Sequence, residues 1–196
     1  MKTLATSLLL ATGLLLAAGT ASAQNNVVKV NILSPLVKTG SFFFEHKLSE
    51  SSSFEIGGLF TSWNIGDTDV TGFAITPEYR FYLSSTKNAM EGFYVGPFLR
   101  YQNLTLNNTS TYTDFDSNGN VITRTDESEA ALNTFGGGVV VGHQWLFKQR
   151  FSLDTFLGPS FNGGSVSYKD NNNGTVDPGS FDGFGIRTGL TFGIAF

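Results

Sequence analysis

The sequence predicts an all-β protein, an eight-stranded antiparallel up-and-down β-barrel that spans a membrane. Three observations lead to this fold class. Apolar and polar residues alternate with a period of two from Val27 to Phe196, and no stretch shows a sustained helical period. Charged residues make up only 14% of the chain, where about 25% is usual in soluble domains. The polar positions are mostly Gly, Ser, Thr and Ala, which suit the crowded interior of a narrow barrel.

The first segment, residues 1–23, is interpreted as a cleaved secretory signal peptide. Lys2 precedes an apolar run at residues 8–18, and "ASA" at 21–23 fits a cleavage site. The run is shorter than the roughly 18 apolar residues of a helix that stays in a membrane. We therefore expect an exported protein whose mature domain, residues 24–196, is a single barrel. The chain has no cysteine, which excludes disulfides and a lipid-modified thiol.

Eight segments carry the alternation and are expected to be the strands. They are residues 27–37, 41–48, 53–63, 70–83, 92–106, 129–147, 151–168 and 181–196. Most approach or exceed the roughly 9 to 11 residues that cross a bilayer at a tilt. Connections after the second, fourth and sixth strands are short, and those after the third, fifth and seventh are mostly longer, although the first, "KTGS", is short too. This asymmetry is typical of short periplasmic turns and longer extracellular loops, with both termini on the periplasmic side.

The two faces of the strands differ in character, as residues 73–83 show. Odd positions there are aromatic or aliphatic apart from one proline, whereas even positions include Glu78 and Arg80. A soluble barrel would alternate too, but its wet face would be richer in long charged side chains. We therefore place the apolar face against lipid. Aromatic residues of outward parity near the short-turn end form one expected girdle: Tyr79, Phe81, Phe93, Trp145, Phe147, Phe151 and Phe196.

Charged residues recur at positions of inward parity. An unpaired charge in a narrow lumen costs several kcal/mol, so we expect these residues to form a structural network of ion pairs that plugs the barrel. A proton or ion relay is the alternative. The residues expected inside are Lys29, Glu45, Lys47, Glu55, Glu78, Arg80, Arg100, Asp154 and Arg187.

Several stretches resemble a known family. With the signal peptide and the terminal aromatic strand, "VVKVNILSPL", "GFAITPEYRFYLS" and "GFYVGPFLRYQ" resemble small Gram-negative outer-membrane barrels of the OmpA/OmpX type, and more closely a functionally uncharacterised branch of them. The resemblance covers residues 27–196. It implies a bacterial outer-membrane location, with outer-membrane lipid and the barrel assembly machinery as partners. It also implies that the final strand serves as an assembly signal, through Leu190, Phe192, Ile194 and Phe196.

Two histidines are the candidates for acid–base chemistry. His143 in "VGHQWLF" lacks a serine two residues later, unlike the His-x-Ser arrangement of barrel-type lipid deacylases, and His46 in "FEHKL" has no serine partner either. We interpret both as interfacial residues and expect neither catalysis nor a cofactor. A barrel-embedded lipid-modifying enzyme and a small pore remain the alternatives.

The longest loop contains "DFDSNGN", in which Asp114, Asp116 and Asn118 have the spacing that opens a calcium-binding loop. The twelfth position is Thr125 where that loop needs a glutamate, and Asn118-Gly119 is a strong hairpin signal. We therefore favour a protruding hairpin over a metal site.

The expected function is that of a non-enzymatic barrel with a plugged lumen. It would contribute to envelope integrity or contact an extracellular partner through loops 107–128 and 169–180. The formal net charge of −4 argues against nucleic acid as a partner.

Overall fold

The structure, a computed structural model, describes residues 24–65, 68–84, 89–116, 119–168 and 183–196. The expected signal peptide at residues 1–23 and the loop at 169–180 lie outside the described residues. Among the described residues there is no helix that is long and apolar enough to cross a membrane.

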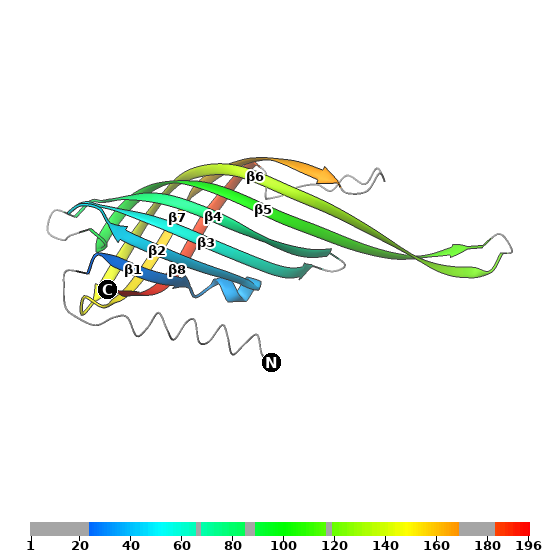
Figure 1. The fold of residues 1–196 in the computed structure, drawn as a ribbon, viewed down its shortest axis with the longest axis horizontal. Helices are drawn as coiled ribbons and strands as arrows, with labels where there is room; N and C mark the ends of the chain where they lie inside the picture. The colour runs from blue at the N-terminus through cyan, green and yellow to red at the C-terminus, as the bar shows by residue number, and fades with distance from the viewer. Residues whose placement is uncertain (1–23, 66–67, 85–88, 117–118, 169–182) are drawn as a thin grey trace.

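Eight strands close into one antiparallel barrel in chain order, so the predicted fold class is confirmed (Figure 1). The strands are β1 (Asn26–Asn31), β2 (Thr39–Lys47), β3 (Ser52–Ile65), β4 (Thr68–Tyr82), β5 (Gly92–Phe115), β6 (Val121–Phe147), β7 (Phe151–Tyr168) and β8 (Gly183–Ala195). A single 3-10 turn, η1 (Ser34–Val37), stands between β1 and β2.

The barrel closes where β1 meets β8, the two strands farthest apart in the sequence. Their register runs from Val27↔Ala195 to Asn31↔Thr191. At the end of this seam the Phe196 amide donates to the Asn26 carbonyl at 2.9 Å, and the Asn26 amide donates to the Phe196 carbonyl at 3.1 Å. Closure matters because an unpaired strand edge in lipid leaves backbone polar groups without partners.

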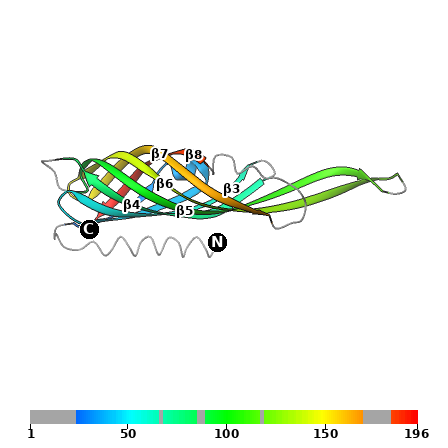
Figure 2. The same cartoon turned by 90° about the horizontal axis from the view of Figure 1, so that it is seen from above.

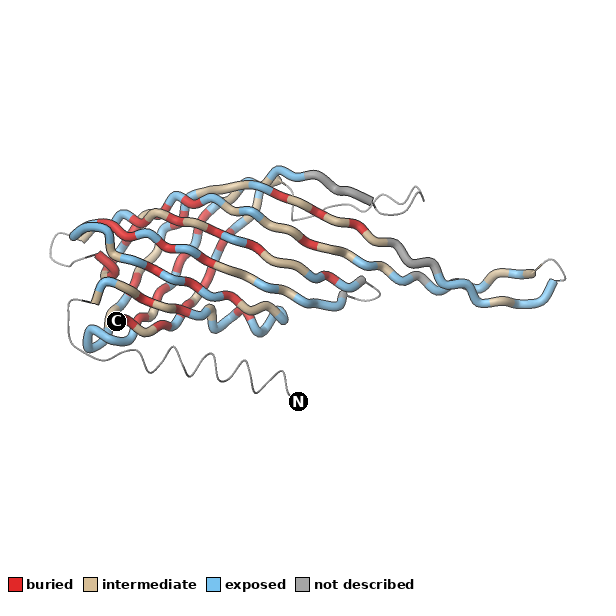
Figure 3. Tube along the Cα trace, viewed as in Figure 1, coloured by how far each residue is buried: buried red, intermediate tan, exposed pale blue. Residues whose placement is uncertain are grey.

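Buried and exposed residues alternate along the strands, as the period of two in the sequence predicts (Figure 3). The polarity of this alternation is the reverse of that in a soluble barrel. Buried positions hold Lys29, Glu45 and Arg80, each with no exposed surface. Exposed positions are large and apolar, and they include Phe42, Phe60, Leu99, Phe161, Phe184 and Ile186. The barrel therefore holds charged side chains inside, beside a cluster of buried aromatic and small apolar ones, and is apolar outside.

The end of the barrel that carries the start of β1 and Phe196 also carries the connections β2–β3, β4–β5 and β6–β7, and is called the turn end from here on. The aromatic residues expected in a girdle there are outward and exposed, except Tyr79, which is half-buried. Inside this end, Met90 of the β4–β5 connection is buried, and its carbonyl accepts a hydrogen bond from Gln144 Nε2 at 2.9 Å. A residue of a connection thus packs into the core at the turn end.

The first strand is shorter than predicted. Residues 27–37 were expected as one strand, but β1 ends at Asn31 and the chain turns through η1. Pro35 has no amide hydrogen to give to a strand ladder, and Lys38 takes a left-handed conformation with φ 48°. The prediction was wrong for residues 32–37, because apolar alternation does not show where a proline ends a strand.

The fifth and sixth strands are longer than predicted. Residues 107–128 were expected as a loop, but β5 and β6 pair continuously from Asn107↔Glu129 to Phe115↔Val121. The segment is rich in threonine and other β-branched residues, which favour strands. The hairpin projects well beyond the rest of the barrel (Figures 1 and 2). The prediction that this segment forms a protruding hairpin is confirmed.

Candidate functional site

A cluster of charged side chains fills the lumen toward the turn end. Its charged members come from five of the eight strands, and neutral members from β5 and β6 join them, because each strand turns every second residue inward. Three of its carboxylates form one row across neighbouring strands, since Glu45 is directly opposite Glu55 and Glu55 is directly opposite Glu78. Like charges in such cross-strand positions repel each other unless cations stand between them.

Lys29 of β1 supplies the first of these cations. Its Nζ lies 2.7 Å from Glu45 Oε2, 2.6 Å from Glu55 Oε2 and 3.2 Å from Asp154 Oδ2. It also donates to Gln144 Oε1 at 2.8 Å. The ammonium group has no exposed surface, so all its partners are protein oxygens.

Arg80 of β4 supplies the second cation. Its Nε lies 2.7 Å from Glu78 Oε1 and its Nη2 lies 2.7 Å from Glu55 Oε1. Its Nη1 lies 2.8 Å from Asp154 Oδ2, and the guanidinium stacks over the Tyr94 ring at 4.2 Å. A planar guanidinium can serve three carboxylates at once because its five donors point outward in one plane.

Neutral side chains complete the cluster. Tyr82 Oη donates to Glu45 Oε1 at 2.6 Å, and Tyr94 Oη donates to Asp154 Oδ1 at 2.9 Å. Ser53 Oγ also donates to Glu45 Oε1. Sequence reasoning missed these three residues and Gln144, although the inward parity that revealed the charged residues applies to them as well. A fully buried network with this many donors fixes each charge in place.

Two of the residues expected in the lumen network, Lys47 and Arg100, lie outside this cluster, and a third, Arg187, joins it only through Glu78. Lys47 pairs with Glu50 at the turn end, with 3.0 Å between Nζ and Oε1. Arg187 of β8 pairs with Glu78 from the side away from Arg80, and its guanidinium packs between the rings of Phe98 and Phe156 at 4.6 and 4.7 Å. Arg100 of β5 points inward without joining any ion pair of the described residues.

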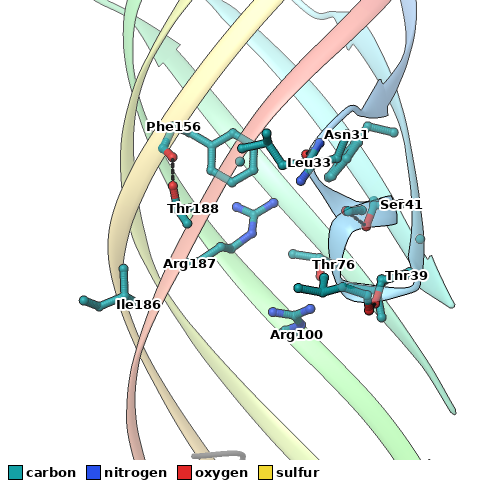
Figure 4. A pocket seen from close by; sticks show the side chains of 17 residues that line it. Asn31, Leu33, Thr39, Ser41, Thr76, Arg100, Phe156, Ile186, Arg187 and Thr188 are labelled. Atoms are coloured by element: carbon teal, nitrogen blue, oxygen red, sulfur yellow. Dashed lines mark hydrogen bonds between the residues drawn. The ribbon is translucent and has the colours of Figure 1, made fainter. Parts of the chain in front are cut away.

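A cavity of about 350 Å³ lies next to the cluster, on the side away from the turn end (Figure 4). Arg100 and Arg187 both line it, with Phe43 and Phe156 on the apolar side. Ser34, Ser41, Thr39, Thr76 and Thr188 line it as well, with the Ser34 and Ser41 hydroxyls bonded to each other and the Thr188 hydroxyl donating to the Phe156 carbonyl. Cavities of this size bind small molecules in other proteins.

The two histidines lie on the outer face, far from this cavity in the register. His46 Nδ1 is 2.8 Å from Asn26 Oδ1, next to the barrel seam. His143 packs against the rings of Phe93 and Trp145, at 4.4 and 4.2 Å between centroids. His143 is also directly opposite Thr155 of β7. The interfacial interpretation of the two histidines stays a prediction.

The two aspartates with calcium-loop spacing, Asp114 and Asp116, form contacts within the hairpin. Asp114 Oδ2 lies 2.7 Å from Arg124 Nε across the two strands. Asp116 accepts hydrogen bonds from the Asn120 amide and side chain, at 2.8 and 3.0 Å, and so shapes the turn. Asn118 lies outside the described residues. These contacts give both aspartates a structural role in the turn.

An antiparallel barrel of eight strands with a charged interior and an apolar exterior is a transmembrane β-barrel. Within this class, the chain belongs to the family described as "Protein of unknown function (DUF3575)", whose model matches residues 8–177. Comparison with curated proteins gives no match.

One solved structure that resembles the chain is the N-terminal β-barrel domain of Pseudomonas aeruginosa OprF. The sequences are 12% identical, and the TM-score is 0.37. The match covers 89% of this chain and 100% of that one.

Proposed function

We propose that this protein is a non-enzymatic barrel of the bacterial outer membrane, and that it acts by presenting the β5–β6 hairpin to a partner outside the cell. The apolar exterior supports the location, since an even number of antiparallel strands with an apolar band is the form of outer-membrane barrels. The buried cluster supports a closed lumen, because Lys29 and Arg80 fill it with side chains that are held by several partners each.

The observation that carries the proposal is the length of the hairpin. Strand β4 pairs with β5 only as far as Asn108, and β7 pairs with β6 only as far as Ala130. Residues 109–116 and 119–129 therefore form a two-stranded hairpin beyond the barrel wall, which we call the ribbon. A two-stranded ribbon without further support is marginally stable in water. Its continuous pairing over this length makes it a candidate surface for recognition.

The tip of the ribbon is apolar and exposed. Phe115 and Val121 are the last pair of the ladder, and they are 64% and 66% exposed. Strand edges offer backbone donors and acceptors to an incoming chain, as in partners that bind by adding a strand. We infer that a protein partner pairs with the ribbon edge and covers the apolar tip. Envelope integrity, the other expected role, would follow if that partner links the membrane to another surface layer.

Proteolysis of intact cells tests the orientation on which this proposal depends. Arg124 lies in the ribbon with 55% of its side chain exposed, and Arg150 lies in the β6–β7 turn. Trypsin added to intact cells should cleave after Arg124 and spare Arg150, with Arg124→Gln as the matched control. Cleavage after Arg150 in intact cells, with Arg124 protected, would contradict the orientation.

Site-specific photo-crosslinking tests the contact itself. A photoreactive residue at Val121 should give a discrete product with a protein outside the cell, whereas the same residue at Lys148 in the turn should not. Changing Phe115 to Ser should weaken the product from position 121. The absence of a product at 121, or the same product from 148, would exclude the ribbon as the contact surface.

Conductance distinguishes this function from a small pore. The parent protein in a planar bilayer should show no steady current, because the cluster fills the lumen. A stable ion-selective conductance of the parent would contradict the closed lumen and favour the pore.

A further inference from the structure

The cavity beside the cluster holds a positive charge that no described residue neutralises. Arg100 lines the cavity, and its Nε is buried without a hydrogen-bond partner. The charged group that acts on it is another cation, Arg187. Arg100 is half-buried, and a partly desolvated charge without a counter-charge gains from an anion that reaches it.

The charges of the lumen are divided between its two ends. Toward the turn end, the four carboxylates of Glu45, Glu55, Glu78 and Asp154 surround only two cations, Lys29 and Arg80. Toward the cavity, Arg100 stands alone and Arg187 shares Glu78 with Arg80. The cavity therefore lies in a positive region of the lumen, although the lumen as a whole has as many of these acids as bases.

The cavity also reaches the outer surface of the barrel. Leu33, Val37 and Ile186 line it, yet these side chains are 46%, 47% and 68% exposed. Leu33 and Val37 follow the end of β1, and Ile186 lies in β8 next to them. At this point η1, and no strand, lies between β8 and β2 (Figure 4). The outer surface is apolar here, and an apolar outer surface is the part of an outer-membrane barrel that meets lipid, which favours an opening toward lipid.

The lining matches a molecule with one anionic end and one apolar end. The guanidinium of Arg100 presents a planar fork that suits an oxyanion such as a carboxylate. The rings of Phe43 and Phe156, together with Val37 and Leu33, give an apolar path from the arginines to the opening. Thr76 also lines the cavity, and a threonine hydroxyl can donate to the same anion.

We propose that this cavity binds the oxyanion head of a membrane amphiphile, with Arg100 as its principal ligand and the apolar chain leaving through the opening beside η1. The ion pair between Arg187 and Glu78 positions the second guanidinium, so Arg100 is the group that gains a partner. This site is separate from the ribbon, and its test does not depend on the surface role.

The test uses the mature protein in nanodiscs of zwitterionic lipid, with laurate as the probe. The chain contains five arginines, so five Nε–Hε signals are expected from protein labelled with ¹⁵N in arginine. Laurate should shift the Arg100 signal in a saturable way. Arg100→Gln should weaken laurate binding about 10- to 100-fold, the effect of losing a charge-assisted contact. Binding of laurate to the variant is followed by the Arg187 signal.

Two further probes decide which part of the ligand matters. Dodecanol has a similar chain without the anion and should leave the Arg100 signal unchanged. Acetate has the head without the chain and should bind far more weakly than laurate. A dodecanol shift equal to that of laurate would overturn the role of the oxyanion, and acetate binding as tight as laurate would overturn the amphiphile.

Two variants keep the test independent of folding. Arg124→Gln, in the ribbon, should leave laurate binding unchanged. Arg100→Lys keeps the charge but loses the planar fork, and should bind laurate with an affinity between those of the parent and Arg100→Gln. If Arg100→Gln folds and binds laurate like the parent, the proposal is wrong.

Discussion

Glu45 and Glu55 are directly opposite each other on neighbouring strands, and both carboxylates contact the same ammonium group. Lys29 Nζ lies 2.7 Å from Glu45 Oε2 and 2.6 Å from Glu55 Oε2. Two facing carboxylates would push β2 and β3 apart in a medium of low polarity, but a shared cation turns the pair into an attraction. The stability of this part of the wall therefore depends on a residue of a third strand, β1.

Replacing Lys29 with Met should destabilise the barrel by about 3–5 kcal/mol, the range for breaking a buried ion pair. The change leaves Glu45 and Glu55 facing each other without Lys29. Urea unfolding in lipid vesicles, followed by tryptophan fluorescence, measures the difference. Lys47→Met is the matched control, because Lys47 pairs with the exposed Glu50 at the turn end and its loss should cost about 1 kcal/mol or less. Equal losses from the two variants would show that the cluster does not stabilise the fold.

Arg80→Lys should recover little of the stability lost in Arg80→Met. Arg80 reaches Glu55, Glu78 and Asp154 through three different nitrogens, and a single ammonium group cannot take up that geometry. We expect Arg80→Met to lose about 3–5 kcal/mol in the same unfolding measurement. Full recovery in Arg80→Lys would mean that the charge alone matters and that the planar fork does not.

Excision of residues 110–126 should leave the barrel folded. This part of the ribbon pairs only within itself among the described residues, because β4 and β7 stop short of it. Segments without contacts to a core tolerate removal. The measurement is heat-modifiable migration on electrophoresis, which reports a closed barrel. Loss of the heat-modifiable form would mean that the ribbon supports the wall of the barrel.

Changing Phe196 to Asp should sharply lower the amount of protein that reaches the membrane. Phe196 is outward and 41% exposed, and its backbone closes the seam with Asn26 at the turn end. A carboxylate there would meet the membrane interface beside β1. Fractionation and immunoblotting measure the amount, with Phe115→Asp at the ribbon tip as the control. If Phe196→Asp reaches the membrane in normal amounts, Phe196 is not part of the assembly signal.

The alternation of the sequence predicted which way each side chain points, but it could not predict how far along the barrel each one lies. Parity places both Arg80 and Arg100 inward. Their different surroundings follow from the stagger between neighbouring strands, which puts Glu45, Glu55 and Glu78 in one row and leaves Arg100 outside it. Register depends on pairing between distant segments, and a single sequence does not display it.

The elements that differed from prediction have local causes. The end of β1 depends on Pro35 and on the left-handed Lys38, whereas the apolar pattern continues past Pro35 to Val37. The ribbon is a long run of polar and β-branched residues, and its polarity made it look like a loop. Its strand character comes from pairing between its own two halves, which hydrophobic alternation does not report.

The short first strand has a consequence for how the barrel assembles. The β1–β8 seam runs only from Val27↔Ala195 to Asn31↔Thr191, whereas β7 and β8 pair from Phe151↔Ile194 to Asn162↔Gly183. It also joins the two segments that are most distant in the chain, so its formation carries the largest loop-closure entropy of any strand pair. We expect β1 and β8 to pair last during insertion and to separate first when the barrel is heated. The weakest line of the wall and the opening of the cavity thus lie on the same side of the molecule.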